Sequence, residues 1–188
     1  MVVEGDMILI GLGSNLTGRH FDSPRAVLEA AVAEMAEHGI EVLHISRFYQ
    51  SEPVPKSDQP WFVNAVASVK TALAPAALLD RLHEIEANLG RERRIRWEAR
   101  IIDLDLLAYE DRALPSKARW RDLSADGGEQ AGGEIIIPHP RLHERLFVLL
   151  PLMDIDPGWR HPVLGERAAE LANKVKKTAK QGIIRPMA

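Results

Sequence analysis

The sequence MILIGLGSN at residues 7–15 decides how the fold begins. It is a short apolar run that ends in Gly-Ser-Asn, a pattern typical of a buried strand entering a loop. Ser23 and Pro24 then supply the cap and the first position of a helix. Apolar residues at helical spacing follow, and Gly39 suits the far end of that helix. The segment therefore predicts a strand followed by an amphipathic helix.

Four further elements continue the pattern. β-branched and aromatic residues over 40–49 and 62–71 predict two strands. Pro75 opens a second helix with leucines at helical spacing until Gly90, and 101–109 is again typical of a strand. The order strand, helix, strand, strand, helix, strand predicts an α+β fold. Specifically, we expect a ferredoxin-like two-layer sandwich, with an antiparallel-rich sheet covered by helices.

The second half of the chain is less regular. A polar stretch over 112–134, with two glycine pairs, predicts an inserted loop. A short helix is expected near 141–147, and a helical C-terminal extension is expected over 166–188. Because 188 residues suffice for one sizeable hydrophobic core, we expect a single domain over 1–188.

Composition narrows the classes of protein and partner. The chain has 24 Lys and Arg against 27 Asp and Glu, a net charge of −3 that does not favour a nucleic-acid partner. The absence of cysteine excludes disulfides and thiolate chemistry and fits a reducing compartment. The longest apolar run, 146–153, is far shorter than the roughly 18 residues of a membrane span. Since the first residues also lack a positively charged start, the expected location is cytoplasmic, away from membranes.

The segment RERRIRWEARIIDLD at 91–105 carries the strongest chemical signal. On a strand, Asp103 and Asp105 would point to one face with their Cα atoms about 6.6 Å apart. Such carboxylates suit Mg²⁺, and the arginines can bind phosphate oxygens. Alternatively, the aspartates are the wet face of an amphipathic strand and the arginines belong to a solvated loop. Aspartate is rare in strands and like charges on one face repel, which leaves the two interpretations about even.

Three other motifs have both a functional and a structural interpretation. Phe62 and Asn64 share a strand face that suits a heteroaromatic ring, although a strand phenylalanine is commonly core. His139 lies between two prolines, where it could contact phosphate or be merely structural. Gly11 and Gly13 favour a tight strand exit that needs glycine backbone angles over a phosphate-binding loop.

Taken in chain order, these residues resemble the 6-hydroxymethyl-7,8-dihydropterin pyrophosphokinase family of the folate pathway. The resemblance covers about residues 7–165. It is carried by the sequences IGLGSNL, FY, DQPWFVNA, IE with GR, RIIDLD, and PH followed by Arg145 and Phe147.

The resemblance implies transfer of the pyrophosphoryl group of ATP to 6-hydroxymethyl-7,8-dihydropterin, with release of AMP. It implies two Mg²⁺ ions held by Asp103 and Asp105, and catalytic roles for these aspartates together with Arg91 and Arg100. The pterin-binding residues implied are Ser51, Glu52, Val54, Phe62, Asn64 and Phe147. The ATP-binding residues implied are Glu86, Arg91, Arg93, Trp97, Arg100, His139 and Arg145. Trp97 would belong to a loop that closes over both substrates, and a functional link to dihydropteroate synthase is also implied.

The chain departs from the family pattern in several places. Glu98 and Ala99 precede Arg100 where the family usually has Gly-Pro or a similar small pair, which puts the motion of the loop in doubt. Ser51 replaces the usual threonine but keeps a hydroxyl group. The stretch 112–134 is longer than in compact members, and no motif gives it a role.

Two rival functions remain open at this point. Paired aspartates and arginines would also suit a metal-dependent phosphodiesterase or nuclease. A ligand-sensing or RNA-binding module would need no Mg²⁺, but RNA binding favours stacked aromatic side chains on adjacent strands, and only Phe62 qualifies.

Overall fold

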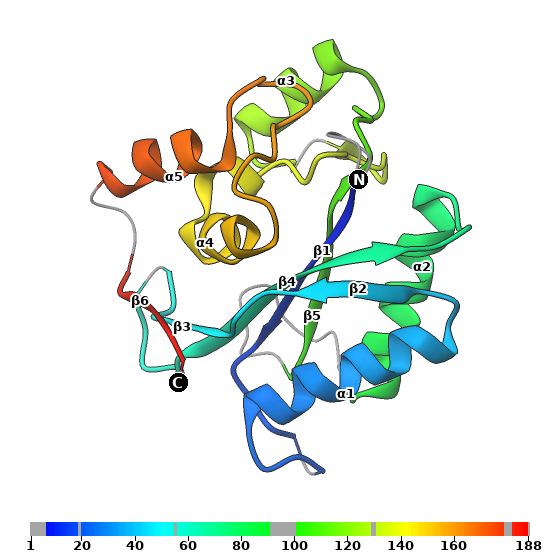
Figure 1. The fold of residues 1–188 in the computed structure, drawn as a ribbon, viewed down its shortest axis with the longest axis vertical. Coiled ribbons are helices and arrows are strands. Elements are labelled where there is room, and N and C mark those ends of the chain that lie inside the picture. Colours follow the sequence, from blue (N-terminus) through cyan, green and yellow to red (C-terminus); the bar gives the residue numbers. More distant parts are fainter. Residues whose placement is uncertain are drawn as a thin grey trace.

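The structure is a computed structural model that describes residues 7–18, 20–54, 56–90, 101–128, 131–178 and 182–187. Figure 1 shows a sheet with α1 and α2 on one side and α4 and α5 on the other. The elements are β1 (Ile8–Ser14), α1 (Pro24–Glu37), β2 (Glu41–Ile45), β3 (Tyr49–Ser51), β4 (Phe62–Lys70), α2 (Pro75–Asn88), β5 (Asp103–Tyr109), α3 (Lys117–Ala125), the 3-10 turn η2 (Leu142–Glu144), α4 (Leu146–Ile155), α5 (Ala168–Lys176) and β6 (Ile184–Pro186).

The sheet is antiparallel throughout the described residues. Its strand order is β5-β1-β4-β3-β6, and β2 also pairs with β4. The chain order β1-α1-β2-β3-β4-α2-β5 follows the predicted alternation of strands and helices, with β2 and β3 in place of one predicted strand. The α+β class and the antiparallel sheet are therefore confirmed. The predicted strand over 40–49 is divided into β2 and β3, which both pair with β4.

One face of the sheet packs against α1 and α2. The start of α1 is as predicted, because Ser23 Oγ accepts a hydrogen bond from the Ala26 N–H at 3.1 Å and Pro24 occupies the first turn. Alternate residues of three strands meet the two helices, as the period of two requires. This core includes Ile10, Leu12, Val63, Ala67, Val69, Leu104, Leu28, Met35, Leu78 and Leu82.

The opposite face carries a second core, which the two-layer expectation lacks. Leu9, Val66 and Leu107 pack there against residues of α4 and α5, including Leu149 and Leu171. Helices thus cover both faces of the sheet, and the architecture has three layers. The sequence does indicate that both faces are covered. In β1 and β4 apolar residues stand on both faces of the strand, a pattern typical of strands buried on both sides.

The stretch 112–134 differs from the predicted inserted loop. It contains α3, whose first turn is capped by Ser116 Oγ, the acceptor for the Arg119 N–H at 3.2 Å. Trp120 is 1% exposed, and its Nε1–H donates to the Pro138 carbonyl at 2.6 Å. A buried tryptophan therefore anchors this segment against the turn that precedes His139.

Two expectations about the last quarter of the chain are corrected. The short helix near 141–147 is instead η2 followed by α4, which continues through Pro151. The segment 166–188 is not helical throughout. α5 ends at Lys176, and β6 then pairs with β3 on the sheet. A three-residue strand gives too short a pattern to recognise from sequence.

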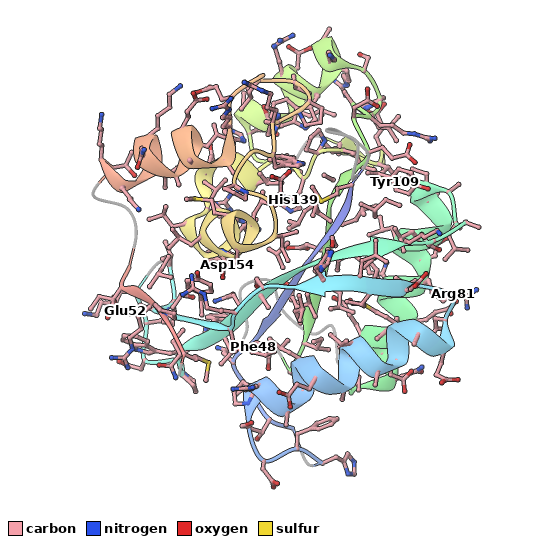
Figure 2. All side chains as sticks on the ribbon, viewed as in Figure 1. Phe48, Glu52, Arg81, Tyr109, His139 and Asp154 are labelled. Atoms are coloured by element: carbon pink, nitrogen blue, oxygen red, sulfur yellow. The ribbon has the colours of Figure 1, made fainter. Side chains whose placement is uncertain are left out.

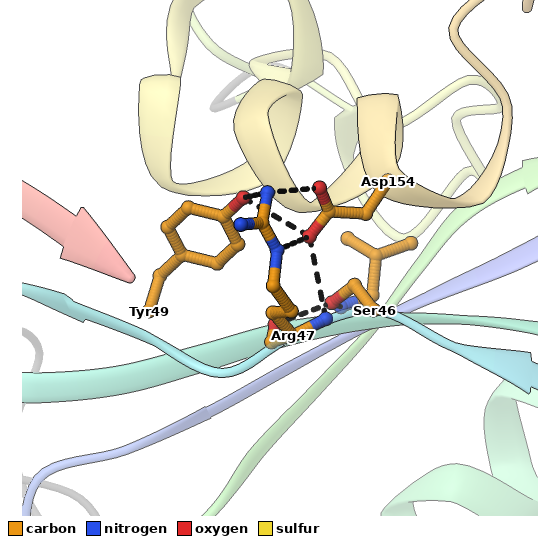
Figure 3. Close-up of polar contacts among 5 residues, drawn as sticks. Ser46, Arg47, Tyr49 and Asp154 are labelled. Carbon is orange, nitrogen blue, oxygen red and sulfur yellow. Dashed lines mark hydrogen bonds and ion pairs between the residues drawn. The ribbon is translucent and has the colours of Figure 1, made fainter. Parts of the chain in front are cut away.

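A polar network joins α4 to the sheet (Figure 3). The Arg47 guanidinium donates to both carboxylate oxygens of Asp154, at 2.6 and 3.0 Å, and the Tyr49 hydroxyl donates to the same group at 3.0 Å. Burial opposes ionisation of Asp154, but the hydrogen bonds from Arg47 and Tyr49 outweigh it and keep the pKa of this carboxyl below its usual value. The network fixes α4 relative to β3.

No helix in the described residues is long and apolar enough to cross a membrane.

Candidate active site

An open cavity of about 780 Å³ lies over the sheet face that packs against α4. Strands β1, β3, β4 and β5, the end of α3 and the start of α4 all contribute to its walls. Its lining brings together many of the residues predicted from sequence, namely Ser51, Glu52, Val54, Phe62, Asn64, Asp103, Asp105, His139, Arg145 and Phe147. His139 lies near the centre of the molecule, beside α4 (Figure 2).

Two glycines form the floor between the polar side chains. In the strand register, Gly11 lies opposite Asp105, and Gly13 lies between Asp103 and Asn64. A Cβ atom on Gly13 would stand 3.5 Å from Asn64 Oδ1 and 4.0 Å from Asp103 Cβ, so a side chain there would fill the cavity. Neither Gly11 nor Gly13 has a positive φ, so the predicted need for glycine backbone angles is wrong. Gly11 and Gly13 are instead explained by the space that the absence of a side chain leaves in the cavity.

Asp103 and Asp105 share the cavity face of β5, as alternation along a strand requires. The carboxylate of Asp105 is 36% exposed, so a ligand can reach it. Within the described residues, no group of three or more His, Asp or Glu suited to a metal is present. Mg²⁺ is commonly bound through one or two carboxylates, with water and substrate phosphates as its other ligands, so this pair fits Mg²⁺ in the presence of a nucleotide.

Glu86 lies behind the two aspartates and does not line the cavity. Its side chain is buried on α2, and Oε1 accepts a 2.7 Å hydrogen bond from the Leu104 N–H. The contact with ATP that the family resemblance implies for Glu86 stays a prediction. Glu86 holds the backbone of the strand that carries Asp103 and Asp105.

Arg145 lies close to both Asp105 and the aromatic ring of Phe147. Its Nη1 lies 3.7 Å from Asp105 Oδ2, and its guanidinium stands 5.5 Å from the centre of the Phe147 ring. Burial lowers the pKa of Arg145 and the nearby Asp105 opposes this effect, but guanidinium stays charged in proteins. The cavity therefore contains a cation beside its carboxylates, which suits a polyanionic phosphate chain.

His139 is held as a neutral hydrogen-bond donor. Its Nδ1 accepts a hydrogen bond from the Arg141 N–H at 3.1 Å, which assigns the proton of the neutral ring to Nε2. Burial, followed by the positive charges of Arg145 and Arg141, lowers the pKa of His139 to about 3. At neutral pH the ring can donate one hydrogen bond to a phosphate oxygen without carrying a charge.

The other end of the cavity has the character of a binding site for a flat heterocycle. Asn64 Nδ2 donates to Ser51 Oγ at 2.9 Å, and both residues are buried. Phe62 and Phe147 reach the cavity from β4 and α4. The cavity therefore combines aromatic faces with an oriented amide.

Several lining residues were not predicted. Arg141 and Glu144 flank His139 and Arg145, and the turn 124–127 at the end of α3 closes the same side of the cavity. Two features of the sequence could have indicated these residues: Arg141 in the sequence PRLHER, and Trp120 in the polar stretch. The predicted Arg91, Arg93, Trp97 and Arg100 lie outside the described residues.

Comparison with known proteins gives an independent result. The family described as 7,8-dihydro-6-hydroxymethylpterin-pyrophosphokinase (HPPK) matches residues 9–157. A 2-amino-4-hydroxy-6-hydroxymethyldihydropteridine pyrophosphokinase from Bacillus subtilis is 36% identical over 147 residues, covering 78% of this chain and 75% of that protein. The enzyme of the same name from Methylorubrum extorquens is 38% identical over 149 residues, covering 79% and 81%.

Larger proteins are matched over only part of their length. The folic acid synthesis protein fol1 of Pneumocystis carinii is 38% identical over 173 residues, which are 92% of this chain but 20% of that protein. A crystal structure of Plasmodium falciparum HPPK-DHPS superposes with a TM-score of 0.66 at 19% identity, over 89% of this chain and 43% of that one. This second likeness supports the fold alone. Because the family matches residues 9–157, which are most of this chain, and two bacterial relatives are more than 35% identical to it, the chain belongs to the HPPK family and is a pyrophosphokinase of folate biosynthesis.

Proposed function

We propose that this chain transfers the pyrophosphoryl group of ATP to the hydroxymethyl oxygen of 6-hydroxymethyl-7,8-dihydropterin, in a reaction that depends on Mg²⁺. One observation carries the proposal. Asp103 and Asp105 open onto the same cavity, and the same sheet face, as Phe62 and Asn64. A metal-binding pair and a heterocycle-binding pair are thus separated only by Gly11 and Gly13.

The nucleotide would occupy the end of the cavity nearest β5. Asp103 and Asp105 would hold two Mg²⁺ ions, which supply charge neutralisation of the phosphate chain when bound. Arg145 would bind phosphate oxygens, and neutral His139 would donate from Nε2. Arg91, Arg93, Trp97 and Arg100 remain predictions for the same end, from their match to the family motif.

The pterin would occupy the end nearest β3 and β4. Phe62 and Phe147 would lie against its two faces, and Asn64 would bind its polar edge through the amide. The Ser51 hydroxyl keeps that amide oriented through its 2.9 Å hydrogen bond. Glu52 and Val54 would complete the wall around the ring.

The chemical step follows from this placement. The hydroxymethyl oxygen attacks the β-phosphorus of ATP, the bond from that phosphorus to the oxygen bridging it to the α-phosphorus breaks, and AMP leaves. The hydroxyl proton is released to solvent or to a nearby base. The side chains of Arg145 and His139 hold the phosphates in line with the attacking oxygen, so that positioning and charge stabilisation provide the catalysis.

The whole-protein context is also part of the proposal. Relatives that join this activity to others include the Plasmodium HPPK-DHPS chains and a protein of Lactococcus lactis named bifunctional protein FolKE, which is 32% identical over 166 residues. The Plasmodium HPPK-DHPS chains support a functional link to dihydropteroate synthase. Cytoplasm remains the predicted location.

The test is AMP formation that depends on the pterin. We expect the chain, ATP and Mg²⁺ to release AMP only when the reduced hydroxymethylpterin is present, and EDTA to stop the reaction. AMP release that is indifferent to the pterin, or cleavage of DNA or RNA under the same conditions, would favour the rival phosphodiesterase.

A further inference from the structure

The family match ends at residue 157, yet the chain returns to the active site after that point. Strand β6 pairs antiparallel with β3, with Gln50 opposite Arg185 and Ser51 opposite Ile184. The Met187 N–H also donates to the Phe48 carbonyl at 2.8 Å. We name residues 182–187 the clamp strand. It adds an outer strand to the sheet at the pterin end of the cavity.

Glu52 is bound to the clamp strand at two points. Its backbone N–H donates to the Ile183 carbonyl at 3.0 Å, and its carboxylate Oε2 accepts from the Ile183 N–H at 3.0 Å. Figure 2 shows Glu52 beside β6, at the edge of the molecule. Glu52, which lines the cavity, is thus held by the backbone of a distant segment.

The clamp strand also reaches the second segment of the pterin pocket. The Arg185 guanidinium lies 5.0 Å from the centre of the Trp61 ring, and Trp61 directly precedes Phe62. Glu52 directly follows Ser51. The clamp strand therefore contacts two of the three segments that supply side chains to the proposed pterin pocket, on the side away from Asp103 and Asp105; the third is α4, which carries Phe147.

We propose that the clamp strand is a positioning element that sets the geometry of the pterin pocket. Without it, the segment after β3 would have no main-chain partner at Glu52 in the described structure, and ordering it would cost conformational entropy when substrate binds. With it, that cost is met during folding. The proposal rests on the pterin being the acceptor substrate.

The first test is a chain that ends after residue 181. Calorimetry would measure binding of a non-hydrolysable ATP analogue with Mg²⁺, and then binding of the pterin to that complex. We expect the Kd of the pterin to rise about tenfold or more and the Kd of the analogue to change less than about twofold. Amide hydrogen exchange at Glu52 should accelerate, a change that a distant structural role would not produce.

A point variant separates the clamp from general loss of stability. A Cβ atom on Gly182 would lie 2.8 Å from Glu52 Cβ and 3.2 Å from its Oε2, so Gly182→Val should displace the clamp strand from Glu52. Ile183→Ala is the matched control, because this side chain is 58% exposed while its N–H and carbonyl make the two bonds to Glu52. Gly182→Val should reproduce the selective loss of pterin affinity, and Ile183→Ala should bind the pterin as the unmodified chain does.

Two outcomes would overturn the proposal. One is an unchanged pterin Kd in both the shortened chain and Gly182→Val. The other is an equal loss of affinity for both ligands, which would assign the clamp strand to overall stability. Failure of the proposed function gives a different result, since the unmodified chain would then form no pterin-dependent AMP at all.

Discussion

The Glu86 carboxylate accepts a 2.7 Å hydrogen bond from the backbone N–H of Leu104, the residue between Asp103 and Asp105. Glu86 comes from α2 on one face of the sheet, and the two aspartates point to the other face. The backbone of β5 passes between them. Packing of α2 therefore fixes the strand segment from which both candidate metal ligands project.

We expect Glu86→Ala to lower the free energy of unfolding by about 1–3 kcal/mol, because a buried N–H loses its acceptor. It should also raise the Mg²⁺ concentration needed for half-maximal turnover, because the strand that carries Asp103 and Asp105 is less firmly held. Glu86→Gln, which keeps an acceptor oxygen, should be milder, and Glu84→Ala on the exposed face of α2 is the control. Urea unfolding and Mg²⁺ titrations check both effects. Unchanged Mg²⁺ dependence in a destabilised Glu86→Ala would restrict Glu86 to folding.

Asp105→Ala should abolish turnover without loss of the fold. The change removes a partly exposed carboxylate that faces the cavity and leaves the sheet intact. Turnover should fall by about a thousandfold or more, as for loss of a group that stabilises the transition state, while the melting temperature stays within a few degrees. Asp80→Ala, on the exposed surface of α2, is the matched control. Turnover near that of the unmodified chain would refute the metal assignment.

Phe62→Ala should weaken pterin binding selectively. One aromatic face of the acceptor pocket would be lost, so we expect the Kd of the pterin to rise about tenfold and that of the ATP analogue to stay within twofold. Calorimetry with each ligand separates the two effects. A parallel fall in both affinities and in stability would mean that Phe62 acts mainly as a core residue.

The parts of the fold with a repeating signal were predictable from sequence. Ser23 and Pro24 predict the start of helix α1. The alternation of apolar residues in β4 correctly placed Val63 and Asn64 on opposite faces of the sheet. The common face of Asp103 and Asp105 also follows from the period of a strand. In each case the information is local, so residues a few positions apart decide the result.

The parts that depend on distant partners were not predictable. Nothing near Trp120 in the sequence shows that its indole N–H will bind the Pro138 carbonyl and so hold α3 against the turn before His139. Strand β6 exists because β3 offers it an edge, and the reason for Gly13 appears only when Asn64 and Asp103 flank it. Tertiary contacts, and not local propensity, determine these features.

The buried His161 and the half-buried His139 should make the protein sensitive to acid. Burial is the main cause that lowers the pKa of His161 and of His139 to about 3, from 6.5. Between these values the unfolded chain binds more protons than the folded one. The contribution of the two histidines to the free energy of unfolding is therefore fully present above pH 6.5 and is lost as the pH falls toward 3. Urea unfolding at pH 7.5 and pH 5 should show this loss.

A substitution tests the assignment of that slope. His161→Gln should reduce the loss of stability between the two pH values, while His44→Gln, at an exposed position of β2, should leave it unchanged. His161→Gln should also lower stability at pH 7.5, because His161 Nδ1 accepts hydrogen bonds from the Val163 and Leu164 N–H groups. An identical pH slope in His161→Gln would disprove a contribution from His161.

In the proposed reaction, two phosphorus atoms of ATP move together to the pterin. The direct measurement uses two ATP samples, one labelled with ³²P at the β-phosphate and one at the γ-phosphate, with Mg²⁺ and the reduced hydroxymethylpterin. Pyrophosphoryl transfer predicts that both labels appear in the pterin product in equal amounts and that the nucleotide released is unlabelled AMP. Label from only the γ-phosphate in the pterin, with the β-label retained in ADP, would contradict the account.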